Sequence, residues 1–240
     1  MPLPYIFSLL FLFAALILLF YGLFILSLNT KSSLHILFFI LCFCLSLWSF
    51  ALSISNSAHD YETCLLWRRI CAFGWGAFFS FLLHFIIILT EKDSILKKKW
   101  MYIPIYFPGI LSVFVFGLYG RLAEKQYNLI ITNTGWVNIS YNTFWDILFN
   151  LYYISFSIIG ILMLFNWAKQ SKEKHRKKKI YIICLLFFLS LFLGTMTEFI
   201  INSMFSIKIP QIAPLIFLIP MTDMLYCVKR YGFMLKKKNN

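Results

Sequence analysis

Apolar residues occur along this chain in long runs that short polar breaks separate. The breaks carry asparagine, serine, proline or clustered charge. A helix needs about 20 apolar residues to cross the hydrocarbon core of a membrane, whereas a barrel strand needs only about 9–11. The run lengths therefore predict an all-α membrane protein, a seven-transmembrane-helix bundle with spans at residues 4–28, 34–55, 68–90, 101–119, 144–168, 180–204 and 211–229.

The composition excludes several other classes of protein. Of the 240 residues, 61% are hydrophobic and 13% are charged, and the mean hydropathy is +0.80. A soluble domain is only about 45–50% apolar and about 25% charged. The chain is therefore not a soluble globular protein, a disordered chain or a secreted disulfide scaffold. Seven spans use about 140 residues, which leaves no room for a separate soluble catalytic domain.

The basic residues are divided unevenly between the two sides of the predicted membrane. The net charge is +13, and 17 of the 22 lysines and arginines fall on one side when the spans are counted in order. Because cytoplasmic loops collect lysine and arginine, this bias predicts an N-terminus outside and a cytoplasmic C-terminus. The chain is also rich in Lys, Asn, Ile and Phe, as in proteins from AT-rich bacterial genes. We therefore expect it in the bacterial cytoplasmic membrane.

Two further groups of residues have simple interpretations. The basic run at 169–179 faces the cytoplasm in this topology and predicts contact with the anionic lipids of the inner leaflet, not with nucleic acid. The six cysteines form no Cys-x-x-Cys pair, and four of them lie within apolar runs. We expect them to be small packing residues and not metal ligands or disulfides.

The sequence lacks the patterns of membrane enzymes. There is no His-Glu-x-x-His zinc motif and no Gly-x-x-x-x-Gly-Lys-Ser/Thr phosphate loop. The stretch 211–228 has no lysine that a retinal Schiff base would require, and the four histidines are scattered. We therefore expect no catalytic residue, no cofactor and no metal.

Two ionisable residues lie inside predicted spans near the cytoplasmic side. His84 and Asp223 each lie six residues from the end of a span, which places both about 9 Å inside the inner boundary. Intramembrane ionisable residues are costly and usually have a partner. One hypothesis is that the two side chains form a pair. The alternative is that each is satisfied by a backbone carbonyl, a Ser or Thr hydroxyl, or water.

Near the outer face, aromatic and charged residues fall at matched depths. Trp48 and Trp75 lie about 10 Å below the outer boundary, deeper than the interfacial belt where tryptophan usually lies. Arg68 or Arg69, together with Glu198, lies above them. These five residues predict an outward-facing sensing cavity, with an aromatic floor and a charged mouth that suit an amphipathic or peptide-like ligand. The alternative is ordinary helix packing, which the glycines on both sides of Trp75 would allow.

Short motifs follow one another along nearly the whole chain. They are Leu66-Trp67-Arg68-Arg69-Ile70, Phe73-Gly74-Trp75, Leu83-His84-Phe85, Leu89-Thr90-Glu91-Lys92, Tyr102-Ile103-Pro104, Gly135-Trp136-Val137, Asn166-Trp167-Ala168, Leu193-Gly194-Thr195, Ile209-Pro210-Gln211-Ile212-Ala213-Pro214 and Lys229-Arg230-Tyr231-Gly232-Phe233-Met234. In this order and spacing the chain resembles the N-terminal seven-transmembrane sensor region of bacterial histidine kinases and diguanylate cyclases.

The resemblance implies an organisation of the chain. Residues 1–234 would form the transmembrane sensor domain, and in the family the last helix leads into a PAS, kinase or cyclase module. Here only a basic cytoplasmic tail at 235–240 follows, and no output domain is present. The chain is then a kinase or cyclase fragment, a degenerate remnant, or a stand-alone subunit whose partner is a separate cytoplasmic kinase or regulator. A homodimer also stays open. The family often has aspartate where Glu198 stands.

Two functions from different classes follow from these observations. The first is a sensory module without enzymatic activity, in which an event at the outer face shifts the bundle between two packings. The second is a small proton- or cation-coupled transporter or channel that uses Glu198, Asp223 and His84. A transport path needs polar residues at several depths, and the middle of the bundle is largely apolar. This favours the sensor, whose ligand the sequence does not identify.

Overall fold

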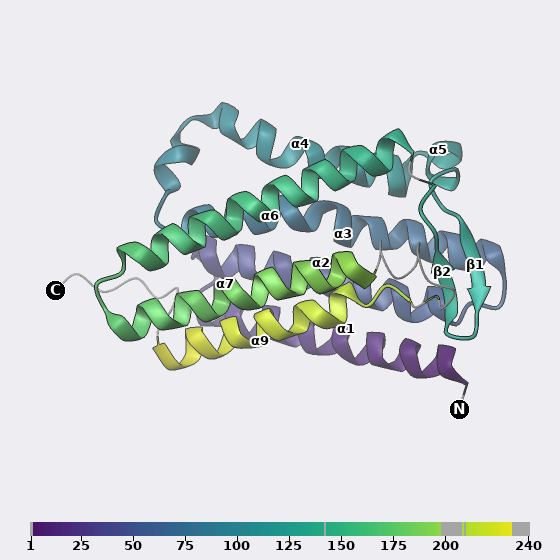
Figure 1. Ribbon diagram of the computed structural model, residues 1–240, viewed down its shortest axis with the longest axis horizontal. Coiled ribbons are helices and arrows are strands. Elements are labelled where there is room, and N and C mark those ends of the chain that lie inside the picture. Colours follow the sequence, from purple (N-terminus) through teal and green to yellow (C-terminus); the bar gives the residue numbers. More distant parts are fainter. Residues whose placement is uncertain (1, 142, 198–207, 209, 232–240) are drawn as a thin grey trace.

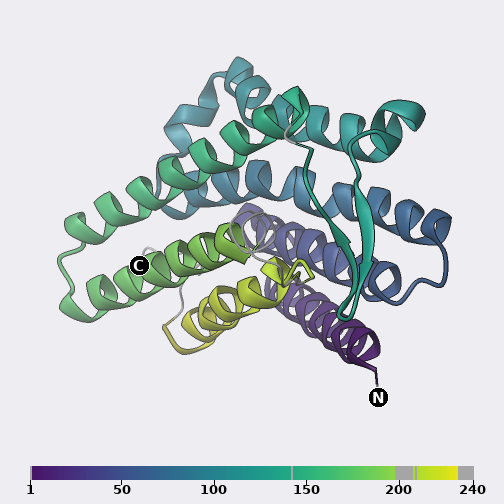
Figure 2. The same cartoon turned by 45° about the vertical axis from the view of Figure 1, so that its right-hand side comes forward.

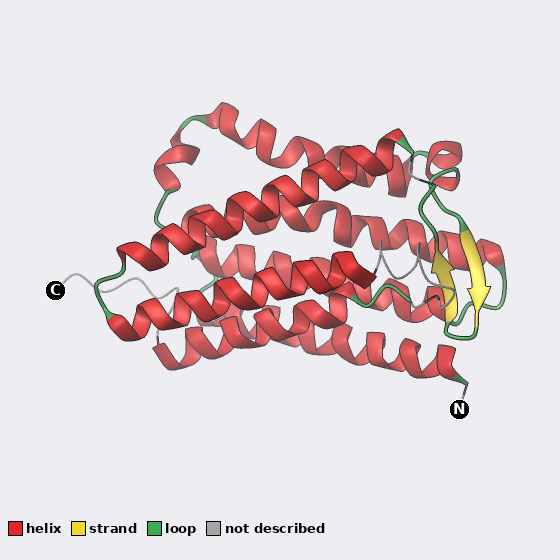
Figure 3. Ribbon diagram, viewed as in Figure 1, coloured by secondary structure: helices red, strands yellow, loops and turns green. Residues whose placement is uncertain are grey.

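The computed structural model describes residues 2–141, 143–197, 208 and 210–231. Most of them are helical, and the strands in the part of the chain described form one short hairpin (Figure 3). The long helices are α1 (Leu3–Leu28), α2 (Ser33–Asn56), α3 (Tyr61–Leu89), α6 (Phe144–Gln170), α7 (Lys174–Thr195) and α9 (Ala213–Tyr231). The shorter elements are η1 (Asp93–Lys97), η2 (Lys99–Met101), α4 (Tyr102–Val113), η3 (Phe114–Leu118), α5 (Gly120–Glu124), β1 (Leu129–Thr132) and β2 (Gly135–Asn138).

The helices confirm the predicted seven-helix bundle. Six described segments are long and apolar enough to cross a membrane, and α9 adds a shorter apolar stretch, Ala213–Val228. The fourth segment is composite, because α4 continues directly into the π-helical turn η3. Helix α3 begins earlier than predicted, since the Asp60 side chain caps it by accepting a 2.7 Å hydrogen bond from the Thr63 amide. The predicted end of the sixth span, residues 198–204, lies outside the described residues.

The helices pack in an order that closes on itself. Helix α1 packs against α2, α2 against α3, and α3 against both α4 and α6. Helix α6 then packs against α7, α7 against α9, and α9 against α1 and α2 (Figures 1 and 2). The last described helix therefore contacts the first.

Two glycines of α3 allow its neighbours to approach closely. A Cβ atom on Gly74 would lie 2.5 Å from the Cys44 carbonyl oxygen and 2.9 Å from Trp48 Cβ, both on α2. A Cβ atom on Gly76 would lie 3.2 Å from Val113 Cγ2 on α4. Small residues at helix crossings let backbones pack tightly in a membrane. The glycines beside Trp75 therefore do bring helices together, as the packing alternative expected.

The segment between the predicted fourth and fifth spans is structured over residues 120–138. It forms α5 and then an antiparallel hairpin in which Leu129 pairs with Asn138 and Thr132 with Gly135. Gly135 has a φ of +112°, and a Cβ atom there would lie 2.5 Å from the carbonyl oxygen of Asn56. The Asn56 side-chain amide donates to the carbonyl oxygens of Pro4 and Thr134. The hairpin is thus held against the ends of α1 and α2.

The hairpin distinguishes the two ends of the bundle. We call the end that carries it and the N-terminus the hairpin end (Figure 1). The α3–α4 and α6–α7 connections lie at the other end, which we call the opposite end (Figure 1). In the topology predicted from the basic residues, the hairpin end faces outward and the opposite end faces the cytoplasm.

Candidate functional site

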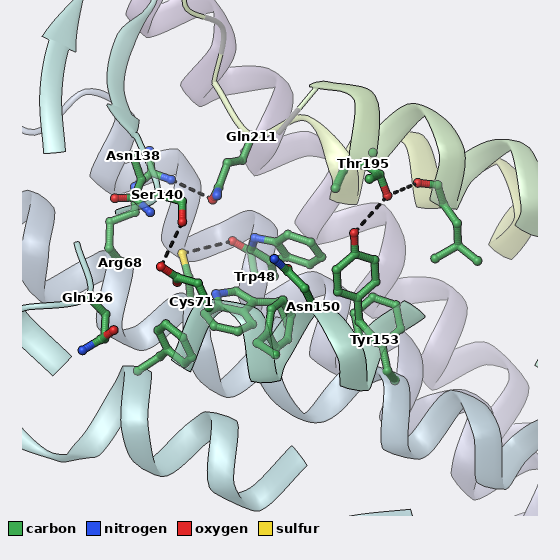
Figure 4. Close-up of a pocket in the computed structure, with 18 of the residues that line it drawn as sticks. Trp48, Arg68, Cys71, Gln126, Asn138, Ser140, Asn150, Tyr153, Thr195 and Gln211 are labelled. Atoms are coloured by element: carbon green, nitrogen blue, oxygen red, sulfur yellow. Dashed lines mark hydrogen bonds between the residues drawn. The ribbon is translucent and has the colours of Figure 1, made fainter. Parts of the chain in front are cut away.

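A cavity of about 120 Å³ lies among the helices toward the hairpin end (Figure 4). Residues of α2, α3, η3, α6, α7 and α9 line it, together with residues beside the hairpin. The lining residues are Trp48, Arg68, Cys71, Trp75, Phe79, Phe116, Gln126, Tyr127, Asn138, Ser140, Asp146, Phe149, Asn150, Tyr153, Ser190, Leu191, Gly194, Thr195, Gln211, Ala213 and Phe217.

One wall of the cavity is aromatic. The Trp75 ring meets Phe149 edge-on, with centroids 4.5 Å apart, and meets Phe116 at 5.1 Å. Phe149 also lies beside Tyr153, at 5.5 Å. Such tilted and edge-to-face contacts hold aromatic rings in fixed orientations. The wall is therefore a preformed apolar surface on which a hydrophobic group can lie.

Arg68 supplies the buried positive charge of the cavity. Its side chain is only 1% exposed. Nη1 donates to Gln211 Oε1 at 2.9 Å, and Nη2 donates to the Trp136 carbonyl oxygen at 2.6 Å. Nε has no hydrogen-bond partner among the described residues. The guanidinium thus joins α3 to the hairpin and to the segment that leads into α9, and its Nε nitrogen has no acceptor among the described residues.

Trp48 faces the same cavity and also keeps an unused donor. Its indole Nε1 is buried and has no hydrogen-bond partner among the described residues. Its backbone carbonyl oxygen accepts a long hydrogen bond from the Cys71 thiol, at 3.8 Å (Figure 4). An indole N–H donates only, so this group is available to an acceptor that enters the cavity.

A second polar group surrounds the start of α6. Thr143 caps this helix, and its hydroxyl donates to Gln126 Oε1 at 2.8 Å. Asp146 Oδ2 accepts hydrogen bonds from the Ser140 hydroxyl at 2.9 Å and from the Thr143 amide at 2.9 Å. The carboxylate therefore fixes the start of α6 and the segment that follows β2.

Tyr127 lines the cavity next to α5. It lies between α5 and β1, and its hydroxyl is within 3.1 Å of the carbonyl oxygens of Arg68 and Phe116. Burial raises the pKa of this phenol because the charged form would lose its hydration. Tyr127 is therefore neutral and acts as a hydrogen-bond donor that braces α3 against η3.

The structure brings three of the five predicted sensing residues to this cavity. Trp48, Arg68 and Trp75 line it together. Arg69 does not, because its guanidinium points to the carbonyl oxygens of Gly117 and Leu118 and lies 4.0 Å from the carboxylate of Glu124. Glu198 lies outside the described residues. That these residues bind a ligand stays a prediction.

The predicted pair of His84 and Asp223 is not brought together. His84 Nδ1 shares a hydrogen bond with the Tyr106 hydroxyl, on α4. The nearest described hydrogen-bond partner of Asp223 is the Cys227 thiol, one turn along α9, at 3.9 Å. The depth estimate matched their heights, but α4 covers the His84 face of α3 while α9 packs on α1, α2 and α7. The two residues are therefore each hydrogen-bonded to a different neighbour and not to one another.

Sequence reasoning missed several cavity residues. Asn150 and Tyr153 lie three residues apart on α6, and Gln211 precedes α9. A polar residue within an apolar run was the available signal for Asn150. Gln211 lay in one of the family-like motifs, but nothing in the sequence indicated that it would meet Arg68.

The described residues show no group of three His, Cys, Asp or Glu side chains that could hold a metal ion. The six cysteines are all buried and free. The cavity is lined by aromatic rings, hydrogen-bonding side chains, the Arg68 guanidinium and the Asp146 carboxylate.

The comparisons with known proteins agree with this architecture. The model of a family described as the N-terminal 7TM region of histidine kinase matches residues 10–235. A search of curated proteins finds no match. The matched region forms the multi-pass membrane part of such kinases and serves as their sensor, not as their catalytic domain. The match covers nearly the whole bundle, so this chain belongs to the family of N-terminal seven-transmembrane regions of histidine kinases.

Proposed function

We propose that this chain is a membrane receptor module in which a ligand occupies the cavity at the hairpin end and α9 carries the resulting shift to the opposite end. The observation that supports it is the composition of the cavity wall. Gln211 and Phe217 line the cavity, so an occupant touches α9 and the segment before it directly. A ligand shifts a bundle only if it binds one packing more tightly than the other.

Helix α9 is joined to its neighbours by contacts that occupancy can alter. Gln211 accepts from Arg68 on α3, and the Phe217 ring lies 5.0 Å from Phe78 on the same helix. On the α7 side, the Ser190 hydroxyl donates to the Ile216 carbonyl oxygen of α9 at 3.4 Å. The upper half of α9 therefore forms part of the cavity, while its lower half reaches the opposite end of the bundle.

The remaining parts of the proposal follow from the sequence. The charge bias supports a hairpin end outside a bacterial cytoplasmic membrane, with the basic segment 169–179 against anionic inner-leaflet lipids. Residues 1–234 would act as the sensor domain and 235–240 as a basic tail. The output would come from a cytoplasmic kinase or regulator, and a second copy of the chain would allow signalling across a dimer.

A chimera that carries a histidine kinase after Met234 tests the proposal. Arg68→Gln and Gln211→Ala both break the link between α3 and the start of α9, so both are expected to change basal autophosphorylation in the same direction. Coupling between sites is typically worth about 5-fold or more, so we expect a change of about that size. Arg69→Gln is the matched control, since Arg69 lies outside the cavity.

Correctly inserted Arg68→Gln and Gln211→Ala chimeras with wild-type output would overturn the proposal. A change of the same size in Arg69→Gln would do so as well, because it would assign the effect to general loosening of α3.

A further inference from the structure

Two buried hydrogen-bond donors of the cavity lining have no acceptor among the described residues. Arg68 Nε and Trp48 Nε1 are both buried, both belong to side chains that line the cavity, and neither has a partner among the described residues. Guanidinium and indole N–H groups can only donate. A buried donor without an acceptor is costly. Two such donors in one cavity point to an occupant that supplies acceptor oxygens.

The surroundings of Arg68 indicate that this occupant is an anion. Arg68 donates to a neutral amide oxygen and a neutral carbonyl oxygen, and no carboxylate lies within ion-pair distance of it among the described residues. A buried charge without a counter-ion is unfavourable. Asp146 lines the same cavity, but its Oδ2 already accepts from Ser140 and Thr143. The carboxylate of Asp146 is thus already hydrogen-bonded by its own segment, whereas Arg68 Nε has no acceptor among the described residues.

The size and walls of the cavity define the rest of the occupant. Its volume is about 120 Å³, whereas an engineered apolar cavity of about 150 Å³ accommodates benzene. The Trp75, Phe116 and Phe149 rings form its apolar side. An occupant of this kind has one small apolar body, of the size of a single ring or a short alkyl chain.

We propose that the cavity binds a small amphipathic monocarboxylate, with its carboxylate between Arg68 and Trp48 and its aryl or short alkyl body against Trp75 and Phe149. This inference rests on the proposed function, because it names the ligand class of the same site. One carboxylate oxygen can accept a charge-assisted hydrogen bond from Arg68 Nε, and the other can accept from Trp48 Nε1. The same chemistry is found in a free acid and in the C-terminal residue of a peptide, and the cavity encloses only that terminal part of a peptide.

Direct binding to the purified full chain in lipid nanodiscs tests the proposal. Butyrate is compared with butyramide, which has nearly the same shape and no charge, by calorimetric titration. We expect the acid to bind about 10-fold more tightly than the amide or better, as a charge-assisted hydrogen bond to a buried arginine predicts. A short peptide that ends in phenylalanine, with its amidated form as control, is titrated in parallel and identifies which source of carboxylate the cavity admits.

Three variants assign the effect to the two donors. Arg68→Gln is expected to remove the preference for acid over amide, and Arg68→Lys is expected to retain part of it because the charge is kept. Trp48→Phe keeps an aromatic ring but loses the N–H, so it is expected to weaken acid binding several-fold and amide binding less. Arg69→Gln is the control and is expected to bind as the wild type does.

Several outcomes would overturn the carboxylate proposal. These are equal affinity for acid and amide, no saturable binding of any carboxylate at millimolar concentration, and an acid preference that survives Arg68→Gln. Acid binding that appears only in Glu198→Gln would also overturn it, because Glu198 would then be the natural counter-ion of Arg68.

The binding assay and the kinase chimera separate the two proposals. The assay uses the chain alone and requires no output. Acid binding without any response of the chimera would leave the ligand class intact and contradict signalling through α9. A chimera that responds to Gln211→Ala while the wild-type chain binds no carboxylate would contradict the ligand class alone.

Discussion

Helix α3 carries a polar side chain in each half of the bundle, and the two are partnered differently. Toward the opposite end, His84 is only half-buried, and its ring contacts the tyrosines of α4 and shares a hydrogen bond with Tyr106. Toward the hairpin end, Arg68 is almost completely buried and lacks both a counter-ion and a partner for Nε among the described residues. The polar residue of α3 at the opposite end therefore stabilises helix packing. The one at the hairpin end has a hydrogen-bond donor without an acceptor among the described residues.

Depth in the membrane therefore does not reveal the role of a polar residue. His84 and Arg68 lie near opposite boundaries of the same span, and a sequence shows both simply as costly groups. What differs is the supply of partners from neighbouring helices. Helix α4 brings a hydroxyl to His84, while the helices around Arg68 surround it with aromatic rings and neutral oxygens.

The largest expected difference between the two ends is their side of the membrane. We predict that an impermeant thiol reagent added to intact cells labels Gly120→Cys at the hairpin end and not Lys172→Cys at the opposite end. Both positions are exposed, and the native cysteines are buried. Permeabilised cells serve as the control, since both positions should then react. Labelling of position 172 in intact cells would reverse the topology.

The second prediction concerns the structure that covers the hairpin end. Gly135→Ala places a Cβ atom against Asn56 at a φ of +112°, so both strain and overlap oppose it. We expect a loss of about 3 kcal/mol in the free energy of unfolding, measured in detergent. Gly120→Ala is the matched control, because nothing lies within 4 Å of its added Cβ. Equal stability of the two variants would mean that the hairpin is not held by Asn56.

The third prediction removes one partner of Arg68. Gln211→Ala leaves the buried guanidinium with one neutral acceptor fewer, and hydrogen bonds to charged groups are worth about 1.5–3 kcal/mol. We expect a loss of about 2 kcal/mol in the free energy of unfolding in detergent. Gln170→Ala, at the exposed end of α6, should be close to neutral. A neutral Gln211→Ala would show that the contact seen at 2.9 Å contributes nothing.

The smallest expected effect is at the opposite end. Tyr106→Phe removes the hydroxyl that meets His84, and a neutral hydrogen bond is worth about 1 kcal/mol. We therefore expect a loss of about 1 kcal/mol in the same assay. Tyr102→Phe is the control, because its ring stacks on Tyr106 without a hydrogen bond that involves His84. If Tyr106→Phe cost more than Gln211→Ala, the contrast between the two ends would be wrong.

Much of the fold followed from the sequence because membrane spans are long and apolar. Hydropathy recovered the seven helices, and the helical rise placed Trp48 and Trp75 at the level where both line one cavity. The rise per residue fixes height but not the direction in which a side chain points relative to its neighbours. For that reason the sequence could not choose between Arg68 and Arg69, which lie about 100° apart around the helix.

The parts that were not predicted depend on contacts between distant segments. The hairpin has strands of only four residues each, so its alternation is too short to recognise within a polar loop. The pairing of Arg68 with Gln211 joins residues far apart in sequence. The hypothesis of a His84–Asp223 pair used matched depth alone, and the order in which helices pack decided against it.

The circular packing order has a consequence for how the protein is made. Helix α9 is synthesised after all the other described helices, yet it packs against α1, where the Thr222 hydroxyl lies 3.4 Å from that of Tyr21. During translation α1 is therefore made before its neighbour α9 has been synthesised. A wall of the cavity is also missing until that moment, because Gln211 and Phe217 help to form it. Ribosomes that stall before residue 211 would leave nascent chains without a complete cavity, so the cavity forms only once α9 has been made.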